Sequence, residues 1–239
     1  MMCEAKIFGV PDQVYYWSLF YNQTLFTDWG IQPPLTFSEL LTTCQVIQRQ
    51  SSSHTAPIAI SGNFELYTGM WFDQLTQRSC GAEKIQNILS GTNDMPIGEE
   101  TCIQIALEAL SQLRSNQCLA AEWQTMDPSS AQDTYINGGA AMILMGSWMT
   151  AELVSIGTPE YQYAVIPFPS MEEGEGNQNA IFGRALVWNI PAESDNPELA
   201  IEFLKRLTNT TTAARAVDQM SIISALNKAP VPEVPAGMG

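Results

Sequence analysis

Residues 135–149 read YINGGAAMILMGSWM, and the apolar run AAMILM at 140–145 predicts a buried β-strand. Gly138 and Gly139 before it predict a tight turn. A glycine-rich turn can also hold a phosphate, but the phosphate-binding loop ends in Gly-Lys-Ser/Thr, and this segment contains no lysine. The turn is therefore favoured over a nucleotide site, and neither interpretation accounts for Trp148.

Three other short apolar runs, bounded by turn residues, predict further strands: APIAI at 56–60, YAVIPF at 163–168 and ALVWNI at 185–190. Helical spacing of apolar residues predicts a helix at about 99–113. Thr36 with Glu39 forms a capping-box sequence, and Asn196 followed by proline predicts another helix start. Strands that alternate with helices indicate an α/β fold with a mostly parallel sheet.

The composition is that of a globular protein with one large or two small domains. The chain has 239 residues, of which 45% are hydrophobic and 15% charged. The chain has ten basic and 25 acidic side chains, so its net charge is −15. Nucleic acid is disfavoured as a partner, because such a surface repels a polyanion. No apolar run approaches the roughly 20 residues that a membrane-spanning helix needs.

The cysteines and the single histidine give little support to a metal site. The five cysteines form no CxxC pair, and His54 is the only histidine. Cys44 and Cys102 lie in helical patterns and are interpreted as small buried thiols. An odd number leaves at least one thiol free, and the sequence assigns no disulfide.

No motif marks a catalytic site, so we expect neither catalytic residues nor a cofactor. A nucleophilic triad needs a histidine base, and His54 stands in the polar run SSSHTAP, which is typical of a surface loop. Asp73, Asp94 and Asp133 stand in no motif that would mark a glycosidase pair. Calcium binding by the acidic run at 172–175 is disfavoured against a solvated loop, because its spacing fits no ligand loop.

Aromatic residues carry the strongest functional signal from the residues themselves. The stretch VYYWSLFYN at 14–22 is rich in tyrosine and tryptophan, and Tyr67 and Trp71 follow later. Such side chains combine a flat apolar face with a polar tip, which suits a sugar ring as well as it suits the core. Both interpretations stay open at this point.

Three stretches resemble the extracellular solute-binding proteins that deliver sugars to ABC importers. GVPDQVYYWSLFYNQTLFTDWGIQPPLTFSELLTTCQVIQ (9–48) is similar to that family's segment around its YYN, PP and TWxEL elements. The family's GKAAM and GxW elements resemble INGGAAMILMGSWM (136–149). Its later strand and helix resemble FGRALVWNIPAESDNPELAIEFLKRLTN (182–209). Gln23, Phe37 and Gly139 depart from the family's usual Lys, Trp and Lys.

The resemblance implies an α/β, periplasmic-binding-protein-like (type II) fold with two lobes that close on a ligand, here incomplete. Residues 10–163 would form most of the second lobe and 164–169 a hinge crossing. Residues 170–220 would be an excursion into the first lobe, and 221–239 the hinge return and tail. Most of the N-terminal lobe and the C-terminal helices would be missing, which would leave the excursion short of packing partners.

The resemblance also implies the function and its residues. The chain is expected to be a non-enzymatic carbohydrate-binding component of an ABC importer, periplasmic or at the cell surface, with the membrane permease subunits as partners. Polyamine or metal-chelate binding, and glycoside processing, are the alternatives. The residues expected to bind the ligand are Tyr15, Tyr16, Tyr67, Trp71, Trp148, Gly183 and Arg184.

Overall fold

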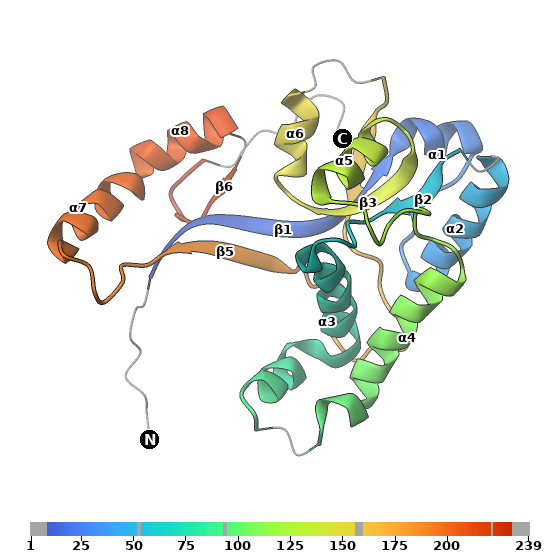
Figure 1. Cartoon of the computed structure of the whole chain (residues 1–239), viewed down its shortest axis with the longest axis horizontal. Coiled ribbons are helices and arrows are strands. Elements are labelled where there is room, and N and C mark those ends of the chain that lie inside the picture. The colour runs from blue at the N-terminus through green and yellow to red at the C-terminus, as the bar shows by residue number, and fades with distance from the viewer. Residues whose placement is uncertain (1–8, 52–53, 93–94, 156–159, 221, 231–239) are drawn as a thin grey trace. The chain divides into compact units, whose positions relative to one another are not determined.

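The computed structural model describes residues 9–51, 54–92, 95–155, 160–220 and 222–230 (Figure 1). These residues belong to two compact units. Unit 1 takes its residues from Met1–Tyr16, Gly146–Gly157 and Gly183–Pro235, and unit 2 from Trp17–Met145 and Thr158–Phe182. Among the described helices, none has the length and apolar character needed to cross a membrane. The lobe boundaries expected above stay a prediction.

Unit 2 is built on strands in the order β2–β3–β1–β4. β1 is the long strand Val10–Asn22, of which the part from Trp17 onward belongs to this unit. Every residue of β3 (Ala140–Gly146) is buried, which confirms the predicted strand AAMILM. The other strands are β2 (Ala56–Ala59) and β4 (Tyr163–Ile166), both within predicted runs.

The prediction of a mostly parallel sheet is wrong. Among the described registers, β2 pairs with β3 in parallel, whereas β4, β5 (Gly183–Trp188) and β6 (Ile223–Ser224) all pair with β1 in antiparallel fashion. The cause is β1 itself, which was not among the predicted strands and which serves as the common partner of the three.

Helices of unit 2 begin where the local sequence supplies a cap. Thr36 and Glu39 form the predicted capping box at the start of α2 (Phe37–Gln50), with 3.2 Å between Glu39 N and Thr36 Oγ1. α2 packs against β2. The other helical segments of the unit are α1 (Gln23–Trp29), α3 (Glu65–Leu89), η1 (Ile97–Glu99), α4 (Thr101–Ser115) and α5 (Pro128–Ile136).

Two disulfides cross-link unit 2, and the interpretation of Cys44 and Cys102 as free thiols is wrong. Cys44 of α2 pairs with Cys118, and Cys80 of α3 pairs with Cys102 of α4, with Cα atoms 5.2 and 4.9 Å apart. Helical spacing predicted their burial, but it could not show which cysteines meet. Cys3 lies outside the described residues. Disulfides of this kind persist in oxidising compartments.

In its described residues, unit 1 contains a three-stranded antiparallel ladder and three helices. The first part of β1 pairs with β5 and β6. α6 (Met149–Ser155) follows Trp148, while α7 (Pro197–Leu207) contacts α8 (Thr210–Met220). α7 begins after Asn196 as predicted. Its last turn carries Lys205 and Arg206, whose positive charges interact favourably with the negative end of the helix dipole.

Large apolar side chains of unit 1 are exposed on both α7 and β5. Leu199 and Phe203, one turn apart on α7, are 70% and 60% exposed, and Ile201 is 45% exposed. On β5, Leu186, Val187 and Trp188 are about half exposed. We refer to Leu199 and Phe203, which share one face of α7, as the apolar surface of unit 1, and exposed apolar side chains of this kind favour association.

We therefore expect the chain to self-associate through this surface. Replacing both Leu199 and Phe203 with lysine should weaken the association at least roughly tenfold, because each side chain buried in a contact contributes about 1.5–3 kcal/mol. Sedimentation velocity over a concentration series measures the change. Leu107→Lys is the matched control, since Leu107 is 49% exposed on α4 of unit 2 and is not part of this surface. A wild-type chain that stays monomeric, with slow amide exchange at 184–207, would contradict the expectation.

Candidate functional site

Tyr15 and Trp148 form a perpendicular aromatic pair in unit 1. Their ring centroids lie 5.1 Å apart at an interplanar angle of 85°. Tyr15 stands on β1, and Trp148 occupies the turn between β3 and α6. Both side chains are partly exposed. An edge-to-face pair fixes the orientation of both rings and leaves indole surface available for another flat group.

The turn that carries Trp148 depends on Gly146 and Ser147. A Cβ atom on Gly146 would overlap the six-membered ring of Trp148, so the indole lies directly over a position that only glycine permits. Ser147 N donates a hydrogen bond to Tyr16 O at 2.8 Å, and Ser147 Oγ accepts one from Tyr16 N at 3.4 Å. Ser147 was not among the predicted site residues, although the sequence GSW pointed to a constrained turn.

The β1–β5 register brings Arg184 to the same side as Tyr15. Tyr15 is the direct partner of Arg184, and residues directly opposite in an antiparallel pair share a face of the sheet. Arg184 is exposed, and among the described residues it forms no ion pair. Tyr15, Trp148 and Arg184 therefore present two aromatic rings and one cationic hydrogen-bond donor on one face of unit 1.

Tyr16 and Gly183 lie on the opposite face of this ladder. They are register partners, and a Cβ on Gly183 would lie 2.9 Å from Tyr16 Cδ1 and 3.1 Å from Tyr15 O. The Tyr16 ring thus covers Gly183. Successive residues of a strand point to opposite faces, so the structure separates the rings of Tyr15 and Tyr16.

Local contacts keep the Tyr15 ring in place and its hydroxyl protonated. The hydroxyl donates a hydrogen bond to Gln13 Oε1. Burial, and secondly the nearby carboxylate of Asp12, raise the pKa of Tyr15 above its ordinary value, so the phenol stays neutral at physiological pH. Asp12 in turn accepts a hydrogen bond from Trp188 Nε1 at 3.0 Å.

Tyr67 and Trp71, the two remaining predicted residues, lie on α3 in unit 2 in different surroundings. Tyr67 is partly exposed and contacts Trp17 edge-to-face at 6.0 Å and the 47% exposed Phe64 at 5.9 Å. Trp71 is only 1% exposed and packs perpendicular to Phe168 at 5.4 Å. The structure therefore places Trp71 in the core of unit 2, with no open indole face there.

The comparisons with known proteins agree on the kind of protein. A family model described as bacterial extracellular solute-binding protein matches residues 4–214. This chain belongs to the bacterial extracellular solute-binding proteins. Among curated proteins, no sequence matches it at a significant level.

Solved structures show the same fold as this solute-binding protein. A chitin oligosaccharide binding protein superposes with a TM-score of 0.82 at 20% identity, over 98% of this chain and 58% of the other. A protein from Caldanaerobius polysaccharolyticus, described in work on xylan utilization, gives 0.80 at 21%, over 96% and 59%. A sugar transporter from Bacillus licheniformis in complex with stachyose gives 0.75 at 19%, over 95% and 58%.

These matches confirm the predicted α/β solute-binding-protein fold. They also set a limit on how far the function of the similar proteins can be applied to this chain. The chain spans less than two thirds of the length of each of these structures. The members of the family are binding proteins. Ligand class, transporter partners and contact residues are taken up below as proposals.

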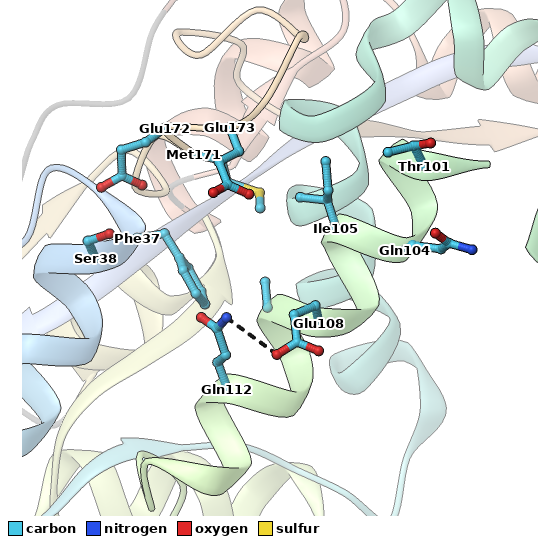
Figure 2. A pocket seen from close by; sticks show the side chains of 11 residues that line it. Phe37, Ser38, Thr101, Gln104, Ile105, Glu108, Gln112, Met171, Glu172 and Glu173 are labelled. Atoms are coloured by element: carbon cyan, nitrogen blue, oxygen red, sulfur yellow. Dashed lines mark hydrogen bonds between the residues drawn. The ribbon is translucent and has the colours of Figure 1, made fainter. Parts of the chain in front are cut away.

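A separate groove of about 440 Å³ lies in unit 2 of this solute-binding protein (Figure 2). Phe37 from the start of α2, Ile105 from α4 and Met171 contribute apolar surface, while Glu108, Glu172 and Glu173 add carboxylates.

The carboxylates of this groove differ in their surroundings. Partial burial acts to raise the pKa of Glu172, but hydrogen bonds from its own backbone N–H and from Ser38 and Thr36 at the start of α2 lower that pKa below its ordinary value. Glu108 accepts one from Gln112 at 3.4 Å. Phe37 is the only aromatic residue of the lining and is 6% exposed, so the groove offers no open aromatic face to a ligand.

The single histidine and the acidic side chains are the remaining candidates for a catalytic base or for metal ligands. His54 Nδ1 lies 3.3 Å from Ser51 O in a loop after α2. Among the described residues no group of three or more His, Cys, Asp or Glu is placed to hold a metal ion.

Proposed function

We propose that this solute-binding protein captures a carbohydrate, with Trp148 and Tyr15 as stacking surfaces and Arg184 as a hydrogen-bond donor. The observation that carries the proposal is the perpendicular Tyr15–Trp148 pair, which shares its face of unit 1 with the exposed Arg184. A sugar ring offers an apolar C–H face to an aromatic ring and hydroxyl oxygens to a guanidinium group.

The remaining predicted residues divide into contact and supporting roles. We propose Tyr67 as a further ligand contact, because it is partly exposed and held between Trp17 and Phe64. Tyr16 and Gly183 shape the ladder that carries Tyr15, through the close approach of the Tyr16 ring to the glycine. Burial of Trp71 supports a role in packing.

The similar structures support a sugar as the ligand class. Their descriptions name a chitin oligosaccharide, xylan and stachyose. By the same reasoning we propose that the protein serves an ABC-type importer, with the permease subunits as partners, in the periplasm or at the cell surface. Two disulfides in unit 2 support an oxidising compartment.

A thermal-shift screen of the full-length natural protein tests the ligand class. Oligosaccharides related to xylan, chitin and raffinose should be compared with spermidine as a non-sugar solute. A ligand at a hundred times its Kd stabilises by about 2.7 kcal/mol, which corresponds to a rise of roughly 5–10 °C in Tm for a chain of about 150–250 residues and to a smaller rise for a longer one. Stabilisation by spermidine and by no sugar would reject the proposal, and cleavage of an oligosaccharide would indicate an enzyme instead.

A further inference from the structure

Gln74 and Arg78 form a buried polar pair on α3. They are one helical turn apart, each is 1% exposed, and Arg78 Nη1 donates a hydrogen bond to Gln74 Oε1 at 2.8 Å. Glutamine and arginine are mostly exposed in proteins, and burying them is costly unless hydrogen bonds replace the lost water. We refer to these two residues as the α3 anchor.

The α3 anchor holds three main-chain segments that are far apart in the sequence. Gln74 Nε2 donates a hydrogen bond to Trp17 O of β1 at 3.2 Å. Arg78 Nη2 donates to Phe168 O at 2.7 Å and to Ala180 O at 3.3 Å. The donors of a planar guanidinium group have a fixed geometry, so they fix these carbonyl groups relative to α3. All three acceptors are backbone oxygens, so the anchor restrains the path of the chain.

The main chain of Arg78 restrains the same segment that leads into β5. Arg78 O accepts hydrogen bonds from Gly176 N at 2.8 Å and from Gln178 Nε2 at 3.0 Å. A Cβ on Gly176 would lie only 2.7 Å from Arg78 O, so this close approach requires glycine. Gly176 and Ala180, at the two ends of this short segment, are therefore both bonded to Arg78.

β1 and β5 pair directly beside these attachment points. Trp17 N donates a hydrogen bond to Phe182 O at 3.0 Å. Two residues further along each strand, Tyr15 is the register partner of Arg184. Both strands therefore enter the ladder from residues that lie at, or two positions after, a carbonyl group held by the α3 anchor.

Burial does not set the register of β5, so the ladder needs another restraint. All six residues of β5 are exposed. Register is strongly specified where one face of a strand is buried and weakly specified where neither face is. At the far end of the ladder, the register shifts between Pro11 and Gln13. A slip of one residue would move the side chain of Arg184 to the face opposite Tyr15.

We propose that the α3 anchor sets the register of β5 on β1 and so places Arg184 on the same face as Tyr15. Gln74 and Arg78 are positioning residues, because they act through backbone carbonyl groups of the segments that enter the ladder. The consequence for ligand binding rests on the proposed function, whereas the register can be tested without a ligand.

Cysteine cross-linking in the full chain with Cys3→Ser measures the register. Val14 lies opposite Ala185, and the neighbouring side chain of Leu186 points to the other face. The native pair, Val14→Cys with Ala185→Cys, should therefore cross-link under mild oxidation. The slipped pair, Val14→Cys with Leu186→Cys, should not cross-link while the anchor is intact.

Removing the anchor should change this pattern. Gln74→Leu with Arg78→Met replaces both residues with apolar side chains of similar size. In this anchor variant the slipped pair should cross-link and the native pair should cross-link less completely. Thr76→Val is the matched control, since Thr76 is 6% exposed on the same helix and its Oγ1 has no hydrogen-bond partner in the described part of the chain. No slipped cross-link in a folded anchor variant, or the same slipped cross-link in Thr76→Val, would overturn the proposal.

Amide exchange in the unaltered chain tests the proposal even if the anchor variant does not fold. Exchange should be slower in the first half of β5, next to Gly183, than in its second half, next to Trp188, because a ladder held at one end opens from the other. Slower exchange next to Trp188 would overturn the proposal.

Ligand binding by the full-length natural protein tests the functional consequence. Arg184→Met should weaken sugar binding roughly ten- to a hundredfold, since it removes a hydrogen bond from a charged group. In the anchor variant the same substitution should have little further effect, because Arg184 has already left the ligand face. An equal loss in both backgrounds would overturn the positioning role. If no sugar binds to the wild-type protein, the proposed function fails, and cross-linking still decides the register.

Discussion

Replacing Trp148 with alanine is expected to weaken carbohydrate binding by roughly 30- to 1,000-fold. Removal of a tryptophan at the centre of a contact costs about 2–4 kcal/mol, and each 1.4 kcal/mol corresponds to a factor of ten in Kd. The substitution also removes the ring against which Tyr15 is oriented. Isothermal titration calorimetry with the best ligand from the thermal-shift screen, on the same full-length protein, measures the change without relying on tryptophan fluorescence.

Controls distinguish lost stacking from lost folding. Trp148→Phe keeps an aromatic face and should retain most of the affinity. Trp29→Ala removes a partly exposed tryptophan at the end of α1 and should leave the affinity unchanged. Unchanged affinity in a folded Trp148→Ala protein would exclude the indole as a ligand surface.

Gly146→Ala offers a second way to disturb the same ring. The added methyl group would overlap the indole and force it to move while keeping its chemistry. A loss of affinity in this variant as well would show that the placement of the ring matters, in addition to its presence.

Removing the Cys44–Cys118 disulfide is expected to lower the free energy of unfolding by about 4 kcal/mol. The bond joins residues 74 positions apart, and the entropy gained by the unfolded chain grows with the length of the closed loop. For Cys80–Cys102, with a separation of 22, the same relation gives about 3 kcal/mol. Denaturant unfolding of the two double alanine variants compares the bonds directly.

The two bonds should also differ in their response to reductant. Cys44 and Cys118 are fully buried, whereas Cys80 and Cys102 line a cavity of about 330 Å³. Mild reductant should therefore open Cys80–Cys102 first, as mass spectrometry after thiol alkylation would show. Earlier alkylation of Cys44 and Cys118 would contradict this order.

The sequence predicted the elements whose signal is local. β2 and β4 lie within the predicted apolar runs, β3 and β5 overlap theirs at residues 140–145 and 185–188, and α2 begins at a complete capping box. β1 was missed because aromatic residues occupy both of its faces and Gln13 and Ser18 interrupt the run, so no period-two pattern remains. Its extended conformation is stabilised by pairing with β4, β5 and β6, which are distant in the sequence.

α3 was missed for a related reason. Its buried side includes Gln74, Thr76, Arg78 and Ser79, all at most 6% exposed, so apolar spacing does not reveal the helix. Hydrogen bonds from Gln74 to Trp17 O and from Arg78 to Phe168 O, far along the chain, supplement the apolar contacts of this helix.

The sequence supplied the candidate site residues but could not show how they are arranged. The family resemblance singled out Tyr15, Trp148 and Arg184, which the structure brings to one face. Tyr67 and Trp71 are one helical turn apart, and only the contact with Phe168 shows that Trp71 is part of the core. The disulfide pairing could not be predicted from the sequence, because Cys44 and Cys118 are 74 positions apart and are brought together by the packing of the whole unit.

The order of the disulfides along the chain has a consequence for biosynthesis. The Cys80–Cys102 bond is nested inside the Cys44–Cys118 loop, so Cys44 pairs with the last cysteine of the series 44, 80, 102, 118 and skips the two between them. A chain exported from its N-terminus presents Cys44 and Cys80 to an oxidant before Cys102 or Cys118 has emerged. Oxidation in order of emergence produces the wrong bond, which must be exchanged through a mixed disulfide. Oxidation in that order therefore makes thiol–disulfide reshuffling a part of maturation, whereas oxidation after Cys118 has emerged allows both bonds to form directly.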